Sequence, residues 1–162
     1  MNQSELHKII STLGYIGFSK IASGTVASFA TAIFSYGCLR YLGIYPLIFF
    51  FMISATLGSY STFIYLKDTG GIDPKEVVID EFAGQSLAII ISFLFAKSYG
   101  EKNLLILVAL NFVLFRFFDI TKIFPISYFD NIENAFGVMA DDVVAGIIAA
   151  LCFLLMQIYF FA

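Results

Sequence analysis

Five long apolar runs constrain this chain more than any other feature of its sequence. Each is near the roughly 20 residues that a helix needs to cross the hydrocarbon core of a bilayer. They cover residues 26–42, 47–66, 77–96, 104–120 and 143–160. Hydrophobic residues make up 60% of the chain, against about 45–50% in soluble domains. The sequence therefore predicts an all-α polytopic membrane bundle with about five spanning helices.

The residues before the first run are mostly polar. Residues 2–13 could form a short amphipathic helix that lies on the membrane surface. The first run begins too late and is too long for a cleaved signal peptide, so we expect the protein to stay in the membrane. No linker divides the chain, which predicts a single domain over residues 1–162. The net charge of −3 gives no reason to expect a nucleic-acid partner.

The charged residues are distributed unevenly between the two predicted sides of the membrane. With the N-terminus inside, six of the nine Lys and Arg residues fall on the inner side, as the positive-inside rule favours. Eleven of the twelve Asp and Glu residues fall there too. Acids contribute little to topology, so this excess indicates that the inner face is the working face.

The fourth run ends in a charged stripe. Arg116, Asp119 and Lys122 follow one another in steps of three, which places them on one side of a helix. Pro125 then ends the helix, and residues 123–140, which also carry Gly137, are predicted to be irregular. Two bases around an acid at the end of an apolar helix are costly to keep for packing alone. The stripe is therefore a candidate half-site, although salt bridges within it would also account for Asp119.

Two acid pairs accompany this stripe. Asp80 and Glu81 open the third run, and Asp141 and Asp142 precede the fifth. The antiparallel connection of neighbouring spans would bring both pairs and Asp119 to one membrane depth. Capping alone could explain each pair, because an acid at a helix N-terminus gains about 0.3–1 kcal/mol. It does not explain Asp119, which lies at a helix C-terminus, so we expect the five acids to form one site.

Each pair is followed by two small residues. Ala83 and Gly84 come after the first pair, and Ala145 and Gly146 come after the second. Small residues let helix backbones approach closely in lipid. The third and fifth spans, which run parallel, could therefore bring their acids within reach of a shared ion.

The acids predict a hard metal ion. His7 is the single histidine, and Cys38 and Cys152 have no metal-ligand spacing. Oxygen ligands without His or Cys suit Mg²⁺, which is usually held by one or two carboxylates plus substrate phosphate. A spare acid could activate water or help to hold a second ion. The predicted metal ligands are Asp80, Glu81, Asp119, Asp141 and Asp142.

Basic residues near the acids predict a phosphate ligand. Arg116 and Lys122 could stabilise charge on phosphoryl oxygens. The turn before the first run could present backbone N–H groups to an anion, or could simply cap the helix. Together these features indicate a lipid substrate with a phosphorylated head group. The candidate substrate-binding residues are Lys20, Ser23, Gly24 and Thr25.

Three motifs resemble a known family. They are Asp-Glu-Phe-Ala-Gly at 80–84, Phe-Arg-Phe-Phe-Asp-Ile-Thr-Lys at 115–122 and Gly-Val-Met-Ala-Asp-Asp-Val-Val-Ala-Gly at 137–146. In order and spacing they resemble the bacterial phosphatidylglycerophosphatase A family, over about residues 14–160. The turn at 23–25 looks like the family's early Pro-Gly-Thr turn, with Ser23 in place of Pro.

This resemblance implies Mg²⁺-dependent hydrolysis of the terminal phosphomonoester of phosphatidylglycerophosphate, a step of phospholipid biosynthesis. It also implies a multi-pass protein of the bacterial cytoplasmic (inner) membrane, with its active site on the cytoplasmic face. The sequence does not indicate an oligomeric state. The candidate catalytic residues are Asp80, Glu81, Asp119, Asp142, Arg116 and Lys122.

Other functions are possible for such an acidic cluster. A CDP-alcohol phosphotransferase also uses Mg²⁺ and membrane-embedded acids, but its Asp-Gly-x2-Ala-Arg signature is absent. Histidine-dependent lipid phosphatases are disfavoured because His7 is the single histidine. A divalent-cation transporter would place its ligands near the bilayer midplane, whereas these acids lie at the ends of the runs.

Overall fold

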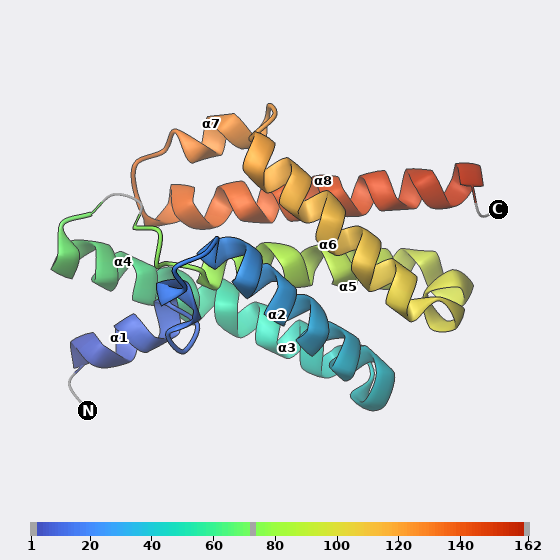
Figure 1. Ribbon diagram of the computed structural model, residues 1–162, viewed down its shortest axis with the longest axis horizontal. Coiled ribbons are helices and arrows are strands. Elements are labelled where there is room, and N and C mark those ends of the chain that lie inside the picture. The colour runs from blue at the N-terminus through green and yellow to red at the C-terminus, as the bar shows by residue number, and fades with distance from the viewer. Residues whose placement is uncertain (1–2, 72–73, 161–162) are drawn as a thin grey trace.

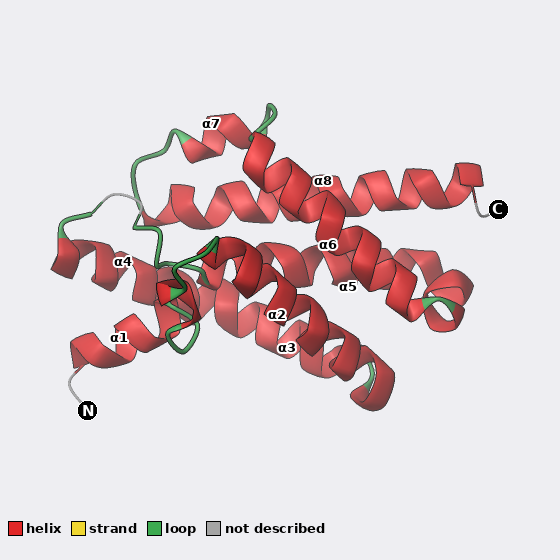
Figure 2. Ribbon diagram, viewed as in Figure 1, coloured by secondary structure: helices red, strands yellow, loops and turns green. Residues whose placement is uncertain are grey.

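The computed structural model describes residues 3–71 and 74–160, and these residues form helices joined by short loops (Figures 1 and 2). No strand occurs among them, which confirms the all-α prediction. The helices are α1 (Gln3–Ser11), α2 (Ser23–Gly37), α3 (Ile44–Ile53), α4 (Ser59–Thr69), α5 (Ile79–Lys102), α6 (Leu104–Thr121), α7 (Ile126–Asp130) and α8 (Ala135–Phe160). A short 3-10 turn covers Ile16–Phe18, and π-helical segments cover Cys38–Leu42 and Ser54–Gly58.

Among the described residues, four helical segments are long and apolar enough to cross a membrane. The first combines α3, the second π-helical segment and α4, and the others lie in α5, α6 and α8. Their bounds are Ile44–Thr69, Ile79–Ala96, Leu104–Thr121 and Ala135–Tyr159. The predicted first span, 26–42, lies in α2 and the π-helical segment after it. It is helical but is not among these four, so the predicted count of about five is approximate.

Helices α5 and α8 run side by side in the same direction through the centre of the molecule (Figure 1). Their backbones nearly touch: a Cβ atom on Gly84 would collide with the carbonyl oxygen of Asp142, and one on Gly146 with the carbonyl oxygen of Gly84. The predicted close approach through small residues is therefore confirmed. It places the N-terminal half of α8 directly against the first turns of α5.

The segment before α8 differs from its prediction. Residues 123–140 were expected to be irregular, but they contain α7 and the first turns of α8. Asn134 explains where α8 begins, because its Oδ1 accepts hydrogen bonds from the backbone N–H groups of Phe136 (2.9 Å) and Gly137 (3.1 Å). This is the geometry of a helix N-cap. A Cβ atom on Gly137 would collide with the carbonyl oxygen of Ile132, so this glycine serves packing instead of marking a loop.

The N-terminal helix α1 is shorter than the predicted 2–13, and residue 2 lies outside the described residues. It packs on α4. The His7 Nδ1 atom lies 3.1 Å from Ser61 Oγ, and Ser4 Oγ donates a hydrogen bond to Asp68 Oδ2 at 2.9 Å. These contacts attach α1 to the same end of the bundle as the charged loops.

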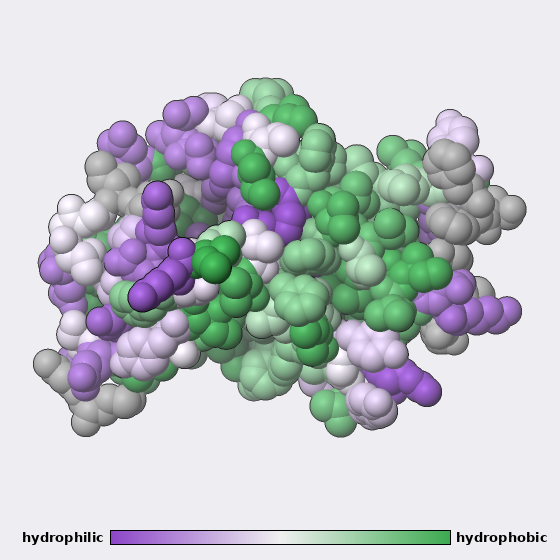
Figure 3. Space-filling model, viewed as in Figure 1, coloured by the Kyte–Doolittle hydropathy of each residue, from purple (hydrophilic) through white to green (hydrophobic). Residues whose placement is uncertain are grey.

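The visible surface carries an apolar band with hydrophilic residues at both ends, more of them at one end than at the other (Figure 3). The larger hydrophilic group lies around α1, α4 and α7, and apolar residues cover the faces of α2 and α6 between the two polar ends. Exposed side chains on these faces include Phe29, Ile33, Val113, Phe117 and Ile120. An apolar surface of this kind suits contact with lipid and would be unfavourable in water.

A candidate active site at the polar end of the bundle

A cavity of about 400 Å³ opens at the polar end of the bundle. It lies between the N-terminal turns of α2 and α5, the C-terminal end of α6, α7 and the first turns of α8. Both predicted acid pairs and the charged stripe of α6 line it. These lining residues are Asp80, Glu81, Arg116, Asp119, Lys122, Asp141 and Asp142.

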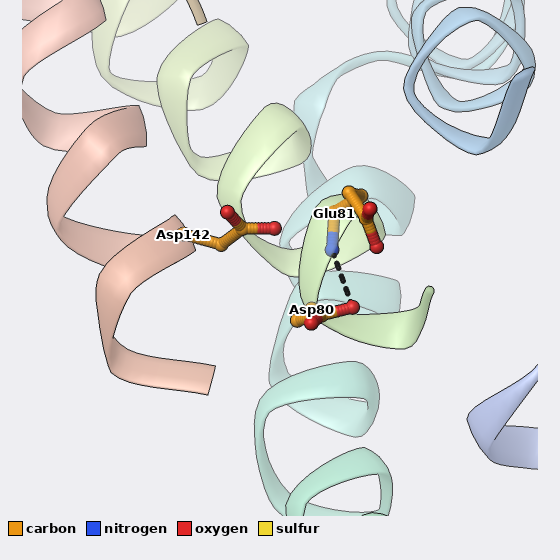
Figure 4. A group of neighbouring side chains, drawn as sticks. All are labelled: Asp80, Glu81 and Asp142. Atoms are coloured by element: carbon orange, nitrogen blue, oxygen red, sulfur yellow. Dashed lines mark hydrogen bonds between the residues drawn. The ribbon is translucent and has the colours of Figure 1, made fainter. Parts of the chain in front are cut away.

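Three carboxylates form a compact group, which we call the acidic triad: Asp80, Glu81 and Asp142. Oxygen atoms from all three lie within 4.8 Å of one another. Asp142 reaches from α8 toward the first turn of α5, where Asp80 Oδ1 accepts a hydrogen bond from the N–H of Glu81 at 3.0 Å (Figure 4). The Asp80 and Asp142 residues are only 8% and 3% exposed. The acidic triad thus joins the first turn of α5 to a residue in the middle of the N-terminal half of α8.

No carboxylate of the acidic triad makes a direct ion pair with a described Lys or Arg side chain. Among the described residues, no Lys or Arg nitrogen lies within 4.0 Å of its carboxylate oxygens. The Oε2 atom of Glu81 is buried and has no hydrogen-bond partner. Buried like charges at this separation repel strongly and are costly to desolvate. A group made only of carboxylate oxygens fits a hard divalent cation such as Mg²⁺.

The charged stripe at the end of α6 lines the same cavity. Asp119 makes ion pairs with both of its neighbours: with Arg116 Nη1, and with Lys122 Nζ at 3.1 Å. The three side chains therefore share one face, as their spacing predicts. The salt bridges that offered an alternative explanation for Asp119 are present, and they fix both cations beside the acidic triad.

Lys122 links three helices. Its Nζ atom also pairs with Asp141 of α8 and lies 3.4 Å from Asp130 Oδ1 of α7. Burial lowers the pKa of Lys122, but attraction to Asp142, Asp141 and Asp119 outweighs it and raises the pKa above its ordinary value. Lys122 therefore remains protonated at neutral pH. The five predicted metal ligands thus fall into two groups: Asp119 and Asp141 make direct ion pairs, and the three acids of the acidic triad make none among the described residues.

The N-terminal turn of α2 contributes another wall. Ser23 and Gly24 line the cavity, but Thr25 does not. Neither hydroxyl caps the helix: the N-cap residue is Ala22, which makes no side-chain cap, and Ser23 Oγ donates to the carbonyl oxygen of Lys75 at 2.7 Å. The capping alternative for this turn is therefore wrong.

The position of Gly24 has a steric reason. A Cβ atom there would collide with Glu81 Oε1 and would lie 3.2 Å from Arg116 Nη1. Glycine thus leaves room for the acidic triad and the stripe to meet at α2. Lys20, predicted to bind substrate, lines a neighbouring cavity together with Lys75.

Some residues of the site were not predicted. Ser28 Oγ lies 3.4 Å from Arg116 Nη1, which donates to it. It follows Gly24 by four residues, so helical periodicity could have indicated it. No sequence pattern indicated that Asp130 belongs to the site, because it lies in a segment that was expected to be irregular. The position of Lys75 depends on its contact with Ser23, which no local pattern reveals.

Comparison with known proteins assigns the family. The sequence model of the family described as Phosphatidylglycerophosphatase A matches residues 9–157. A protein of Haemophilus influenzae with the same name is 40% identical over 131 residues, which cover 80% of this chain and 76% of that protein. The Escherichia coli protein of this name is 34% identical over 137 residues, which cover 83% and 73% of the two chains. No solved structure matches the chain.

The family match covers every helix that contributes to the cavity, from the N-terminal turn of α2 to α8. It also agrees with the resemblance carried by the three motifs, whose charged residues all line that cavity. The chain belongs to the phosphatidylglycerophosphatase A family of lipid phosphatases.

Proposed function

We propose that this protein hydrolyses the terminal phosphomonoester of phosphatidylglycerophosphate, with Mg²⁺, to give phosphatidylglycerol and phosphate in phospholipid biosynthesis. The family and the names of both relatives support the substrate. The excess of acids on the predicted inner side supports an active site on the cytoplasmic face of a bacterial inner membrane.

One observation carries the proposal: two buried carboxylates and one partly buried carboxylate, which make no direct ion pair among the described residues, lie in the same cavity as Arg116 and Lys122. Carboxylates alone would repel a phosphate. A phosphate site made only of basic side chains would not require the acidic triad. The combination suits a phosphate that is bound through a metal ion and through basic side chains at once.

Mg²⁺ bound at Asp80, Glu81 and Asp142 would supply Lewis-acid stabilisation of the phosphoryl group. Arg116 and Lys122 would stabilise the charge on its non-bridging oxygens, by position and electrostatics. Asp119 would hold both cations in place through its two ion pairs. The uncapped first turn of α2 would offer backbone N–H groups to the anion.

The attacking group could be a water molecule activated by one carboxylate, or an Asp that forms a transient aspartyl-phosphate. Rapid-quench trapping with substrate labelled in the terminal phosphate separates the two. Acid-stable label on the protein during turnover would show the covalent route, and its absence would show direct attack by water.

The transporter alternative lacks support from the rest of the bundle. Beyond the acidic triad, residues 82–96 of α5 and 143–160 of α8 contain no charged residue. The buried polar contact deeper in the bundle is neutral, with Ser92 Oγ donating to Asn111 Oδ1 at 2.8 Å. A path for a divalent cation across the membrane would need oxygen ligands along its length.

The direct test measures phosphate released from phosphatidylglycerophosphate by the purified protein in detergent micelles. We expect release with Mg²⁺, loss of release with a chelator, and recovery when Mg²⁺ is restored. The same protein in vesicles tests the transporter. Metal uptake without phosphate release would overturn the proposal, as would release that is unaffected by chelation.

A further inference from the structure

We propose that Lys20 and Lys75 form a second anion subsite, which binds the internal phosphodiester of the substrate while its terminal phosphate lies at the acidic triad. This inference rests on the proposed function and adds a residue-level explanation of how one class of lipid is selected.

The subsite lies in a second cavity, of about 460 Å³, beside the first. Lys20 and Lys75 both line it. Ala22, Ser23 and Lys75 line both cavities, so the two spaces share a wall. A head group could therefore occupy both cavities at once.

The two lysines are free to bind an anion. Neither makes an ion pair among the described residues, whereas Arg116 and Lys122 are both paired with Asp119. The acid that lines the second cavity, Glu76, accepts a hydrogen bond from the Tyr65 hydroxyl at 3.1 Å. The second cavity is net basic because two lysines and one acid line it, whereas acids outnumber bases in the lining of the first.

The wall that carries these lysines is fixed by tight contacts. The loop before α2 packs so closely on Glu76 that a Cβ atom on Gly17 would collide with its carbonyl oxygen. The Ser23 hydroxyl donates a hydrogen bond to the carbonyl oxygen of Lys75, the residue before Glu76. Two segments more than fifty residues apart in sequence are thereby held together, and each brings one lysine.

The substrate has the chemistry that such a site would bind. Phosphatidylglycerophosphate carries a phosphomonoester and a phosphodiester, separated by one glycerol unit. Lysine binds phosphate as a point charge without demanding a fixed geometry. The diester does not react, so its contacts are the same in the ground and transition states. Such uniform binding lowers KM and leaves kcat unchanged.

The test compares two lipids in neutral detergent micelles: phosphatidylglycerophosphate, and phosphatidic acid, which has a phosphomonoester but no diester. Phosphatidic acid is measured as a substrate or, if it is not turned over, as a competitive inhibitor. The variant is Lys20→Gln with Lys75→Gln. The matched control is Lys67→Gln, an exposed lysine on α4 that lines neither cavity.

We expect the double variant to raise KM for phosphatidylglycerophosphate roughly tenfold, with kcat within about twofold of the wild type. The affinity for phosphatidic acid should not change, and the control should match the wild type for both lipids. Equal weakening for both lipids would overturn the proposal in favour of general attraction to anionic surfaces. An unchanged KM for both would overturn it outright. Wild-type protein that releases no phosphate from phosphatidylglycerophosphate would instead contradict the proposed function.

Discussion

The two acid pairs look alike in sequence but occupy different positions in their helices. Asp80 and Glu81 lie in the first turn of α5, where the helix dipole favours negative charge. Asp141 and Asp142 lie at the seventh and eighth positions of α8, counted from Ala135, where the dipole has little effect. Within each pair the local geometry is the same: the first Asp accepts the N–H of the next residue, at 3.0 and 2.9 Å.

This difference in position shows for which acid pair helix capping can explain the presence of negative charge. It can account for the α5 pair, but the α8 pair has no such benefit and is more costly to bury. Lys122 makes a direct ion pair with Asp141, whereas Asp142, in the acidic triad, makes none with any described side chain. A buried acid that is stabilised neither by a helix end nor by a salt bridge indicates a functional ligand.

The largest effect should come from removing one carboxylate of the acidic triad on either helix. We expect Asp142→Asn and Glu81→Gln each to lower kcat more than about 100-fold, because even residues that only support a metal's ligands cost 10–100-fold when mutated. Phosphate release at saturating Mg²⁺ measures this. Asp68→Asn, on the exposed end of α4, is the control and should be near normal. If only one of the two substitutions lowered kcat, the proposal of a metal site shared by α5 and α8 would be wrong.

The next effect concerns Lys122, the partner of the α8 pair. Removing one member of a buried ion pair costs about 3–5 kcal/mol, and less here because Lys122 is partly exposed, so we expect Lys122→Gln to lower the free energy of unfolding by roughly 2 kcal/mol. Asp141→Asn in the same background should recover part of this loss, because it removes the unpaired charge. Denaturant unfolding in detergent measures both, and additive losses would mean that the two residues are not coupled.

Disturbing the close packing of α5 on α8 should have a smaller effect on stability and activity. Gly84→Ala would place a methyl group against the carbonyl oxygen of Asp142 and 2.7 Å from Phe115 Cε2. Overpacking of this kind costs about 1–3 kcal/mol, and it should also lower activity by separating the two pairs. Gly37→Ala on α2 is the matched control, since a Cβ atom there meets nothing within 4 Å. Equal stability of the two variants would contradict the close approach.

The smallest effect concerns the start of α8. Asn134→Ala removes the N-cap and should cost about 1 kcal/mol of unfolding free energy, whereas Asn134→Asp keeps a capping oxygen and should cost less. Thermal unfolding of the two variants measures the difference. A loss as large for Asp as for Ala would show that the cap is not what begins α8.

The sequence predicts the features that depend on local periodicity. The apolar runs, the first turn of α5 and the shared face of the α6 stripe all follow from spacing along a helix. The approach of α5 to α8 follows from Gly84 and Gly146, because small residues allow such contact wherever a neighbour is available.

The features that were missed depend on residues whose role is ambiguous without their neighbours. Gly137 suggested a loop, but the helix passes through it because the carbonyl oxygen of Ile132 leaves room only for glycine. Because the whole segment was expected to be irregular, α7 was not predicted, and neither was the role of Asp130. The division of the five acids into paired and unpaired groups depends on where the flexible side chain of Lys122 lies, which helical spacing does not determine.

The most direct test of the shared site is titration calorimetry of Mg²⁺ into the purified protein in detergent, without lipid. We expect a binding signal in the wild type and in Asp68→Asn, and its loss in both Asp80→Asn on α5 and Asp142→Asn on α8. Mg²⁺ binding that survives in either triad variant with unchanged affinity would contradict a metal site shared by the two helices.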